Sequence, residues 1–206
     1  MSDLVTGDDG KARCRWGSSD ERYRAYHDTE WGRPVTDEHG LYERLCLECL
    51  QSGLSWALIL RKRDEIRAAL AGFDPDAVAA FGRKEIEALL QDPRVIRNRR
   101  KLEAIVQNAR AVVAMRDDAP LPELAWSFRP APRPAPRAYA GMPSLTEESK
   151  QFAKELKRRG FAFVGPTTAY ATMQAAGLVN DHLAGCFVQD EVEAAQRDVQ
   201  RLFAGR

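Results

Sequence analysis

Apolar residues recur along this chain at helical spacing, and no stretch alternates apolar and polar positions as a half-buried strand would. The clearest example is KLEAIVQNARAVVAM, residues 101–115, where apolar side chains fall three or four positions apart on one face. A second amphipathic segment covers about residues 37–51, and Gly53 breaks the pattern before another begins near Ser55. The chain is therefore predicted to be all-α.

Local sequence signals predict where other helices begin and end. The Asp-Pro pairs at residues 74–75 and 92–93 have the form of an N-cap followed by proline in the first helical position, so each is expected to open a helix. Ser144 and Glu147 have capping-box spacing, and the helix they start should end near Gly160.

Three segments differ in character from the rest of the chain. Residues 1–12 are expected to form a flexible extension, and residues 187–206 a charged helical tail whose apolar stripe docks on the body. Residues 129–143 have four prolines within seven positions, which predicts an extended connector; a ligand for a proline-binding module is the alternative. A single domain is therefore assigned to residues 13–186.

Length and composition narrow the class of protein. The 206 residues, 44% of them hydrophobic, suffice for one domain with a packed core. No apolar run approaches the roughly 18 residues that cross a bilayer, and the acidic start lacks the apolar stretch of a signal peptide. We therefore expect a cytoplasmic protein with no membrane partner. The net charge of +1 means that local patches would have to bind any polyanion.

Cysteine and histidine residues near the two ends of the chain are candidate metal ligands. Four cysteines without a secretory signal suggest reduced thiols or metal ligands, and not a disulfide framework. His182 and Cys186 lie four residues apart, so on a helix they would share one face and could share one ion. Cys14 and His27 would complete a tetrahedral set with them.

Cys46 and Cys49 offer a competing half of this site. Their C-x₂-C spacing falls within LYERLCLECLQ, which is predicted to be helical and is rich in leucine, so two buried thiols are the alternative. If four protein ligands close the site, no position is left for water, and the metal has a structural role and not a hydrolytic one. Zinc would then clamp the two ends of the domain together.

Aromatic residues are concentrated in the first 56 positions, which hold Trp16, Tyr23, Tyr26, Trp31, Tyr42 and Trp56. Aromatic faces attract flat or cationic ligands by stacking and cation–π interaction, so this group is a candidate binding pocket. Glu48 falls in the same region among leucines, where a buried carboxylate needs a hydrogen-bond donor or a cation. The alternative is that Glu48 lies on the solvent side of its helix.

Residues 154–177 combine features of nucleic-acid binding. They predict a helix, a glycine-containing hairpin and a second helix that begins at Thr167 or Thr168 and ends at Gly177. Free backbone N–H groups at such a helix start bind phosphate without reading sequence. Two basic runs support this interpretation, with a solvated surface as the alternative. They comprise Arg97, Arg99, Arg100 and Lys101, and Lys154, Lys157, Arg158 and Arg159.

The motifs in this sequence resemble those of the DNA 3-methyladenine glycosylase I family of base-excision repair enzymes. The matching segments are RCRWG (13–17), YRAYHDTEWGRPVTD (23–37), LCLECLQSGLSW (45–56), RNRRK (97–101), WSF (126–128) and residues 156–186. The resemblance covers most of the chain and implies a helix-hairpin-helix glycosylase fold with a zinc clamp joining its ends. It also implies a monofunctional enzyme, without lyase activity, that flips N3-methyladenine out of double-stranded DNA and excises it by hydrolysis.

The resemblance further implies roles for individual residues. One structural zinc ion per chain would be bound by Cys14, His27, His182 and Cys186. Glu48 would be catalytic, and the damaged base would be bound by Tyr26, Trp56, Trp16, Tyr23 and Trp31. Contacts to DNA would come from the hairpin residues Gly165, Thr167 and Thr168. Leu54 is a candidate wedge for the gap that a flipped nucleotide leaves, and nothing in the sequence demands more than a monomer.

The implied substrate requires little acid catalysis. N3-methylation gives adenine a positive charge while it is attached to deoxyribose, so the base is already a good leaving group. The pocket must then select the cation. We expect Trp56 to stack on it, and Tyr26 and Glu48 to hydrogen-bond to its edge.

The sequence departs from the family pattern in its longer N-terminus, its proline-rich connector, Cys49 and the segment after Cys186, none of which coincides with a matched site. Two other functions stay open. Asp181 could be the catalytic aspartate of the wider glycosylase superfamily, although capping a helix or orienting a metal ligand is its simpler role. Alternatively, the chain could be a non-catalytic, zinc-stabilised helix-hairpin-helix module that only binds DNA.

Overall fold

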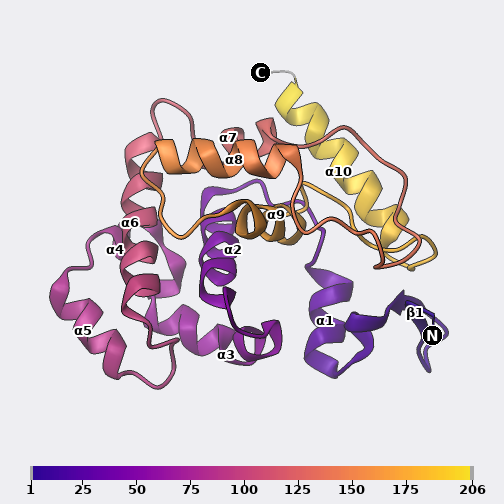
Figure 1. The fold of residues 1–206 in the computed structure, drawn as a ribbon, viewed down its shortest axis with the longest axis horizontal. Helices are drawn as coiled ribbons and strands as arrows, with labels where there is room; N and C mark the ends of the chain where they lie inside the picture. Colours follow the sequence, from indigo (N-terminus) through magenta and orange to yellow (C-terminus); the bar gives the residue numbers. More distant parts are fainter. Residues whose placement is uncertain (1, 205–206) are drawn as a thin grey trace.

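The computed structural model describes residues 2–204, and it confirms the predicted all-α fold apart from one small hairpin (Figure 1). The α-helices are α1 (Glu21–Thr29), α2 (Glu38–Gln51), α3 (Trp56–Ala69), α4 (Pro75–Ala79), α5 (Arg83–Gln91), α6 (Arg99–Met115), α7 (Leu121–Ser127), α8 (Glu147–Arg158), α9 (Pro166–Ala175) and α10 (Gln189–Ala204). Two short 3-10 helices are η1 (Arg15–Ser18) and η2 (Ala71–Phe73). The strands are β1 (Leu4–Thr6) and β2 (Ala12–Cys14).

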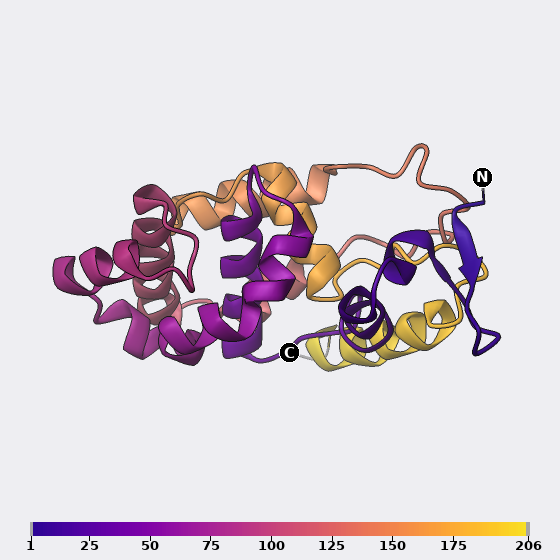
Figure 2. The same ribbon diagram turned by 90° about the horizontal axis from the view of Figure 1, so that it is seen from below.

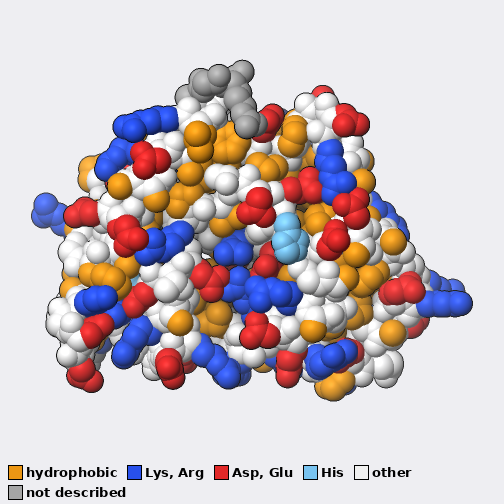
Figure 3. All heavy atoms as spheres, turned by 180° about the vertical axis from the view of Figure 1, so that it is seen from behind, with side chains coloured by type: hydrophobic (Ala, Val, Ile, Leu, Met, Phe, Trp, Pro, Cys, Tyr) orange, Lys and Arg blue, Asp and Glu red, His pale blue; other side chains and the backbone are white. Residues whose placement is uncertain are grey.

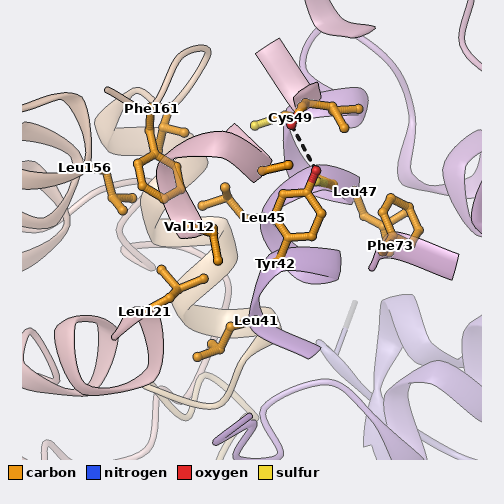
Figure 4. Close-up of a cluster of buried hydrophobic side chains, with 14 of the residues drawn as sticks. Leu41, Tyr42, Leu45, Leu47, Cys49, Phe73, Val112, Leu121, Leu156 and Phe161 are labelled. Carbon is orange, nitrogen blue, oxygen red and sulfur yellow. Dashed lines mark hydrogen bonds between the residues drawn. The ribbon is translucent and has the colours of Figure 1, made fainter. Parts of the chain in front are cut away.

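Helix α2 lies at the centre of the larger hydrophobic core. It is buried along nearly its whole length because α3, α6, α7 and α9 pack around it. Side chains from α2, α6 and α8 point toward one another there (Figure 4). The Tyr42 hydroxyl donates a hydrogen bond to the Ile105 carbonyl at 2.9 Å, so this tyrosine belongs to the core. Cys46 and Cys49 are also buried here, as the alternative for these two thiols predicted.

A second, smaller core joins the two ends of the chain. Its buried members are Cys14, Leu183, Cys186, Val188 and Val192. Helix α1, the strands and helix α10 lie at one end of the molecule, opposite the bundle that contains α4, α5 and α6 (Figure 2). Residues 129–143, predicted to be an extended connector, contain no helix or strand and run from α7 to the end of the molecule that holds the strands (Figure 2).

The N-terminal segment differs from its prediction. Residues 1–12 were expected to form a flexible extension, but β1 and β2 pair in antiparallel register, with Leu4 opposite Cys14. The Leu4 side chain packs against the smaller core, which ties the hairpin to the domain. Strands of three residues are too short to show an alternating pattern, so periodicity could not reveal them.

Helices α2 and α3 begin where the apolar pattern placed them, and α4 begins at its predicted cap. The side chains of Asp37, Ser55 and Asp74 each accept a backbone N–H of the first turn. The prediction that the Asp-Pro pair at 92–93 opens a helix is wrong. Asp92 follows the last residue of α5, its carboxylate accepts the Arg94 N–H at 2.9 Å in a turn, and α6 begins at its own cap further along. An aspartate before proline suits a turn as well as a helix start.

The cap of helix α8 lies two residues beyond the predicted position. Thr146 and Ser149 form the capping box, with the Ser149 N–H bonded to the Thr146 hydroxyl at 3.3 Å, in place of Ser144 and Glu147. The helix ends at Arg158, and Gly160 follows with φ 95°, a left-handed conformation that favours glycine. The predicted end near Gly160 is confirmed.

Helices α8 and α9 are joined by the predicted glycine-containing hairpin. Gly165 caps α9 and Pro166 occupies its first position, so the expectation that Thr167 or Thr168 is the cap is wrong; both lie in the first turn. Asn108 on α6 holds the hairpin from behind. Its amide accepts the Ala162 N–H at 2.7 Å and donates to the Ala162 carbonyl at 3.1 Å.

Helix α10 docks on the body through part of its predicted apolar stripe. Val192 and Gln196 are buried, and the Gln196 amide donates to the Gly32 carbonyl at 3.0 Å. Leu202, at the end of the stripe, is 67% exposed, so that part of the prediction is wrong. None of the helices described is long and apolar enough to cross a membrane.

Candidate functional site

A cavity of about 300 Å³ lies between η1 and α1 on one side and α2, α3 and α9 on the other. It is lined by Trp16, Tyr23, Tyr26, Trp31, Glu48, Gln51, Trp56, Ala171 and Gln174. Its volume is at the lower end of the range for small-molecule sites. The structure therefore brings together the glutamate and all five of the aromatic residues that were expected to bind a base.

The aromatic side chains are held in place by contacts with one another. Tyr23 and Tyr26 lie three residues apart on α1 and so share a face. Trp16 meets Trp31 edge-on, with ring centroids 5.0 Å apart, and Tyr26 lies 5.0 Å from Trp56. Because each ring is fixed by a neighbour, the pocket is formed before any ligand arrives.

Glu48 lies in the last turn of α2, and its residue is only 7% exposed, so the alternative in which it faces solvent is wrong. Burial raises the pKa of this carboxyl to about 8. Within the described part of the chain, its side chain makes no hydrogen bond or ion pair. At neutral pH the empty pocket therefore holds a largely uncharged carboxylic acid, which a cationic ligand would convert to a carboxylate.

The turn between α2 and α3 lies beside the cavity and is held in place by Lys101 of α6. Gly53 has φ 76°, and Leu54 next to it is 39% exposed. The Lys101 ammonium donates to the Leu50 carbonyl at 2.7 Å and to the Ser52 carbonyl at 2.5 Å. Lys101 is itself only 5% exposed, so it is not part of a basic surface but a positive charge at the C-terminal end of α2.

The four predicted metal ligands meet at one point. The ligand atoms of Cys14, His27, His182 and Cys186 all lie within 4.8 Å of one another, and all four residues are buried. His182 and Cys186 were expected to share a helix, but they lie in the loop between α9 and α10. A turn there brings the Cys186 N–H to the Leu183 carbonyl at 2.9 Å. A turn and a helix both bring residues four apart close together.

The surroundings of the two histidines select which ring nitrogen faces the centre. His27 Nδ1 lies 2.8 Å from the Asp28 carboxylate, and His182 Nε2 lies 3.0 Å from the Trp31 carbonyl. The opposite nitrogens, His27 Nε2 and His182 Nδ1, lie 3.4 and 3.7 Å from Cys186 Sγ. Hydrogen bonds of this kind typically orient metal-bound histidines. The donor set therefore fits a metal ion with four protein ligands and no open position.

The metal-ligand cluster and the cavity share a wall. The Trp16 ring lies 5.1 Å from the His27 ring, and the Trp31 ring lies 4.6 Å from the His182 ring. Two of the aromatic residues that line the cavity thus rest directly on candidate ligands. A metal ion bound by these residues would fix the position of this wall through packing.

A family model described as methyladenine glycosylase matches residues 16–189. The chain belongs to this family. It is 47% identical over 178 residues to DNA-3-methyladenine glycosylase 1 of Escherichia coli strain K12, covering 84% of this chain and 95% of that protein. It is 44% identical over 178 residues to DNA-3-methyladenine glycosylase of Haemophilus influenzae, covering 84% and 96%.

Solved structures agree with this assignment to the methyladenine glycosylase family. A crystal structure of 3-methyladenine DNA glycosylase I superimposes with a TM-score of 0.81 at 47% identity, covering 85% of this chain and 98% of that one. The Staphylococcus aureus 3-methyladenine DNA glycosylase I, whose structure addresses recognition of 3-methyladenine, gives a TM-score of 0.81 at 32% identity, covering 86% and 96%. The family expected from the sequence motifs is confirmed.

Three residues that line the cavity were not anticipated from the sequence: Gln51, Ala171 and Gln174. Ala171 and Gln174 lie three residues apart on α9, so helical spacing places both on the face that closes the cavity. Neither residue type stands out in a sequence. What identifies them is that α9 packs against α2, a long-range contact that periodicity does not reveal.

Asp181 is not among the residues that line the cavity. It is buried, and its carboxylate accepts hydrogen bonds from the Tyr170 hydroxyl and the Gln174 amide, each at 2.7 Å, and from Arg133. The cap that bonds the His182 N–H is Asn180 instead. The alternative in which Asp181 attacks or activates a ligand directly has no support in this geometry.

Three arginines of the two basic runs are paired with acidic neighbours. Arg99 pairs with Glu87 at 2.8 Å, and Arg158 and Arg159 both pair with Glu155. Basic and acidic side chains are intermingled on the face seen in Figure 3, without a broad patch of one sign. Arg100 differs, because its guanidinium lies 5.7 Å from the ring of Phe163 in the hairpin.

Proposed function

We propose that this protein excises N3-methyladenine from alkylated double-stranded DNA by hydrolysing the bond between the base and deoxyribose. The observation that carries the proposal is Glu48, a buried acid without a counter-ion in a cavity lined by aromatic faces. Once this acid is ionised, the cavity lacks one positive charge. A purine methylated at N3 supplies that charge while it is still attached to the sugar, and it has the flat shape that stacking on Trp56 requires.

The chemical step follows from the charge of the bound base. As the bond between C1′ and N9 breaks, both electrons stay on N9 and the base becomes neutral. Water then adds to the sugar cation and loses a proton. Glu48 releases its proton to solvent as the cation binds, and its carboxylate then stabilises positive charge close to the reacting bond. Tyr26 and Glu48 hydrogen-bond to the edge of the base. We propose that the reaction stops at hydrolysis, without a lyase step.

The base must leave the helical stack to reach this cavity. We assign the wedge to Leu54, because it is one of few large apolar side chains that are more than a third exposed, and it lies on the fixed turn at the cavity edge. The hairpin between α8 and α9 would bind the phosphate backbone through the free N–H groups that follow Gly165, including those of Thr167 and Thr168.

The metal in the four-ligand centre is proposed to be a single structural zinc ion. Two thiols and two imidazoles at tetrahedral spacing suit zinc, and a closed shell leaves no site for hydrolytic water. When bound, the ion would supply only cross-linking of the chain ends through Cys14, His27, His182 and Cys186. We further propose that the protein acts as a monomer in the cytoplasm.

Release of free base from methylated duplex DNA tests the proposal. We expect Glu48→Gln and Trp56→Ala to lower the single-turnover rate of N3-methyladenine release by 10-fold or more, because each removes an interaction with the cation. Glu103→Gln, at a half-exposed site on α6, serves as the matched control and should leave the rate unchanged. Near-native rates in both pocket variants would remove these residues from the mechanism. Binding without release by the wild type would favour a non-catalytic DNA-binding module.

A further inference from the structure

Gln174 is a polar residue of the cavity whose side chain is already held on one side. Its Nε2 group donates to Asp181 Oδ2 at 2.7 Å, and its main-chain carbonyl accepts the Gly32 N–H at 3.1 Å. Both ends of the residue are thus fixed. The amide oxygen, Oε1, makes no hydrogen bond to any residue that the structure describes, although the side chain lines the cavity.

Asp181 determines which end of the Gln174 amide is free. Its side chain is fully buried and sits among donors: the Tyr170 hydroxyl, the Arg133 guanidinium and the Gln174 amide nitrogen. A carboxylate paired with a guanidinium accepts hydrogen bonds and does not donate them, so the NH₂ group of Gln174 must point toward Asp181. The amide oxygen then points away from Asp181 and is left as an acceptor for a ligand, while one N–H of the amide is engaged by Asp181.

The cavity therefore offers one hydrogen-bond acceptor, Gln174 Oε1, to the edge of a bound base, and we place position 6 of the purine against it. An adenine has an amino group at position 6, which donates two hydrogen bonds. A guanine has an oxygen at the same position, which would face the Gln174 oxygen and leave both acceptors without a partner. A buried polar group without a partner typically costs about 1–3 kcal/mol, which is roughly a 5- to 150-fold change in rate.

We propose that Gln174 is a specificity-determining residue that selects 6-amino over 6-oxo purines, and that Asp181 and Arg133 are positioning residues that hold its amide in the required orientation. The inference rests on the proposed function, because it concerns the same cavity. It gives the proline-rich connector a role, since Arg133 belongs to that segment and reaches the buried Asp181 from it.

The test uses duplex DNA treated with a methylating agent, which contains both N3-methyladenine and N3-methylguanine. Both free bases are separated and quantified from one incubation, which gives the release rate of N3-methyladenine divided by that of N3-methylguanine. Gln174→Met keeps the length of the side chain and removes the acceptor, so we expect this ratio to fall at least 5-fold. Asp181→Asn allows the Gln174 amide to rotate by 180°, so this variant should also lower the ratio. Gln91→Met, at an exposed position on α5, is the control and should keep the wild-type ratio.

The ratio distinguishes selection from a merely structural role. A variant that only loosens the fold slows release of both bases in equal proportion, and that outcome for Gln174→Met would overturn the inference. If Asp181→Asn does not fold, as circular dichroism would show, Gln174→Met decides the question alone. A wild-type protein that releases neither base would refute the proposed function, whereas release with an unchanged ratio in Gln174→Met would refute only the selection by Gln174.

Discussion

Replacing Glu48 with glutamine should stabilise the folded protein at neutral pH. The folded-state pKa of this carboxyl is about 8, compared with 4.5 for an unperturbed glutamate. The folded state therefore keeps the proton to higher pH than the unfolded state does. The favourable contribution of Glu48 to the free energy of unfolding is complete below pH 4.5 and is lost as the pH rises through about 8. Glutamine has nearly the same shape and does not titrate, so the variant escapes this loss.

The size of the effect follows from the difference in pKa. At about 1.36 kcal/mol per pH unit, the 2.5 units between 4.5 and pH 7 correspond to roughly 3 kcal/mol, and the full shift to about 8 corresponds to roughly 5 kcal/mol. The free energy of unfolding of Glu48→Gln minus that of the wild type should grow by these amounts between pH 4.5 and pH 8, then level off. Water entering the pocket would reduce them, so they are upper values.

Urea unfolding followed by far-ultraviolet circular dichroism at pH 5, 7 and 8.5 measures this difference. Glu103→Gln, whose side chain is 54% exposed in the wild type, should show no comparable growth with pH. A difference between Glu48→Gln and wild type that stays constant across the three pH values would refute the reasoning, because it would mean that Glu48 titrates normally in the folded protein.

Other expectations follow from the site. Leu54→Ala should slow excision from duplex DNA several-fold but not from methylated single strands, while Leu202→Ala, exposed elsewhere, should change neither rate. Lys101→Met should cost about 1–3 kcal/mol in urea unfolding, because two carbonyls lose their donor; unchanged stability would refute its anchoring role. Native mass spectrometry should find one zinc ion, and Cys186→Ser should lower both zinc content and melting temperature. An unaltered melting temperature after complete chelation would contradict a structural metal.

The sequence predicted the parts of the fold that depend on local patterns. Helix α6 shows a long apolar stripe, α2 and α3 are separated by the break at Gly53, and Asp74 is a cap before proline, so these elements could be placed. Errors arose where one local signal suits two structures. Asp92 before a proline closes a turn after α5 instead of opening a helix, and the two short strands leave no periodic trace.

The candidate site was predicted only in part, for a physical reason. Motifs in the sequence pointed to Glu48, Trp56 and the metal-ligand set, since charged, aromatic and sulfur-bearing residues stand out by type. Gln174 could not be found in this way, and Lys101 was assigned to a basic surface run and not to its buried position under the turn. Their roles depend on helices α9 and α6 approaching α2, and packing between distant segments is not encoded in spacing along the chain.

The most direct test of a pocket for a cationic purine is single-turnover release from an otherwise undamaged duplex that carries N3-methyladenine at one site. The account predicts that wild-type protein liberates the free methylated base, leaves the strand unbroken, and removes no unmodified adenine at a measurable rate. Removal of adenine and N3-methyladenine at similar rates, or tight binding of the duplex without any liberated base, would contradict it.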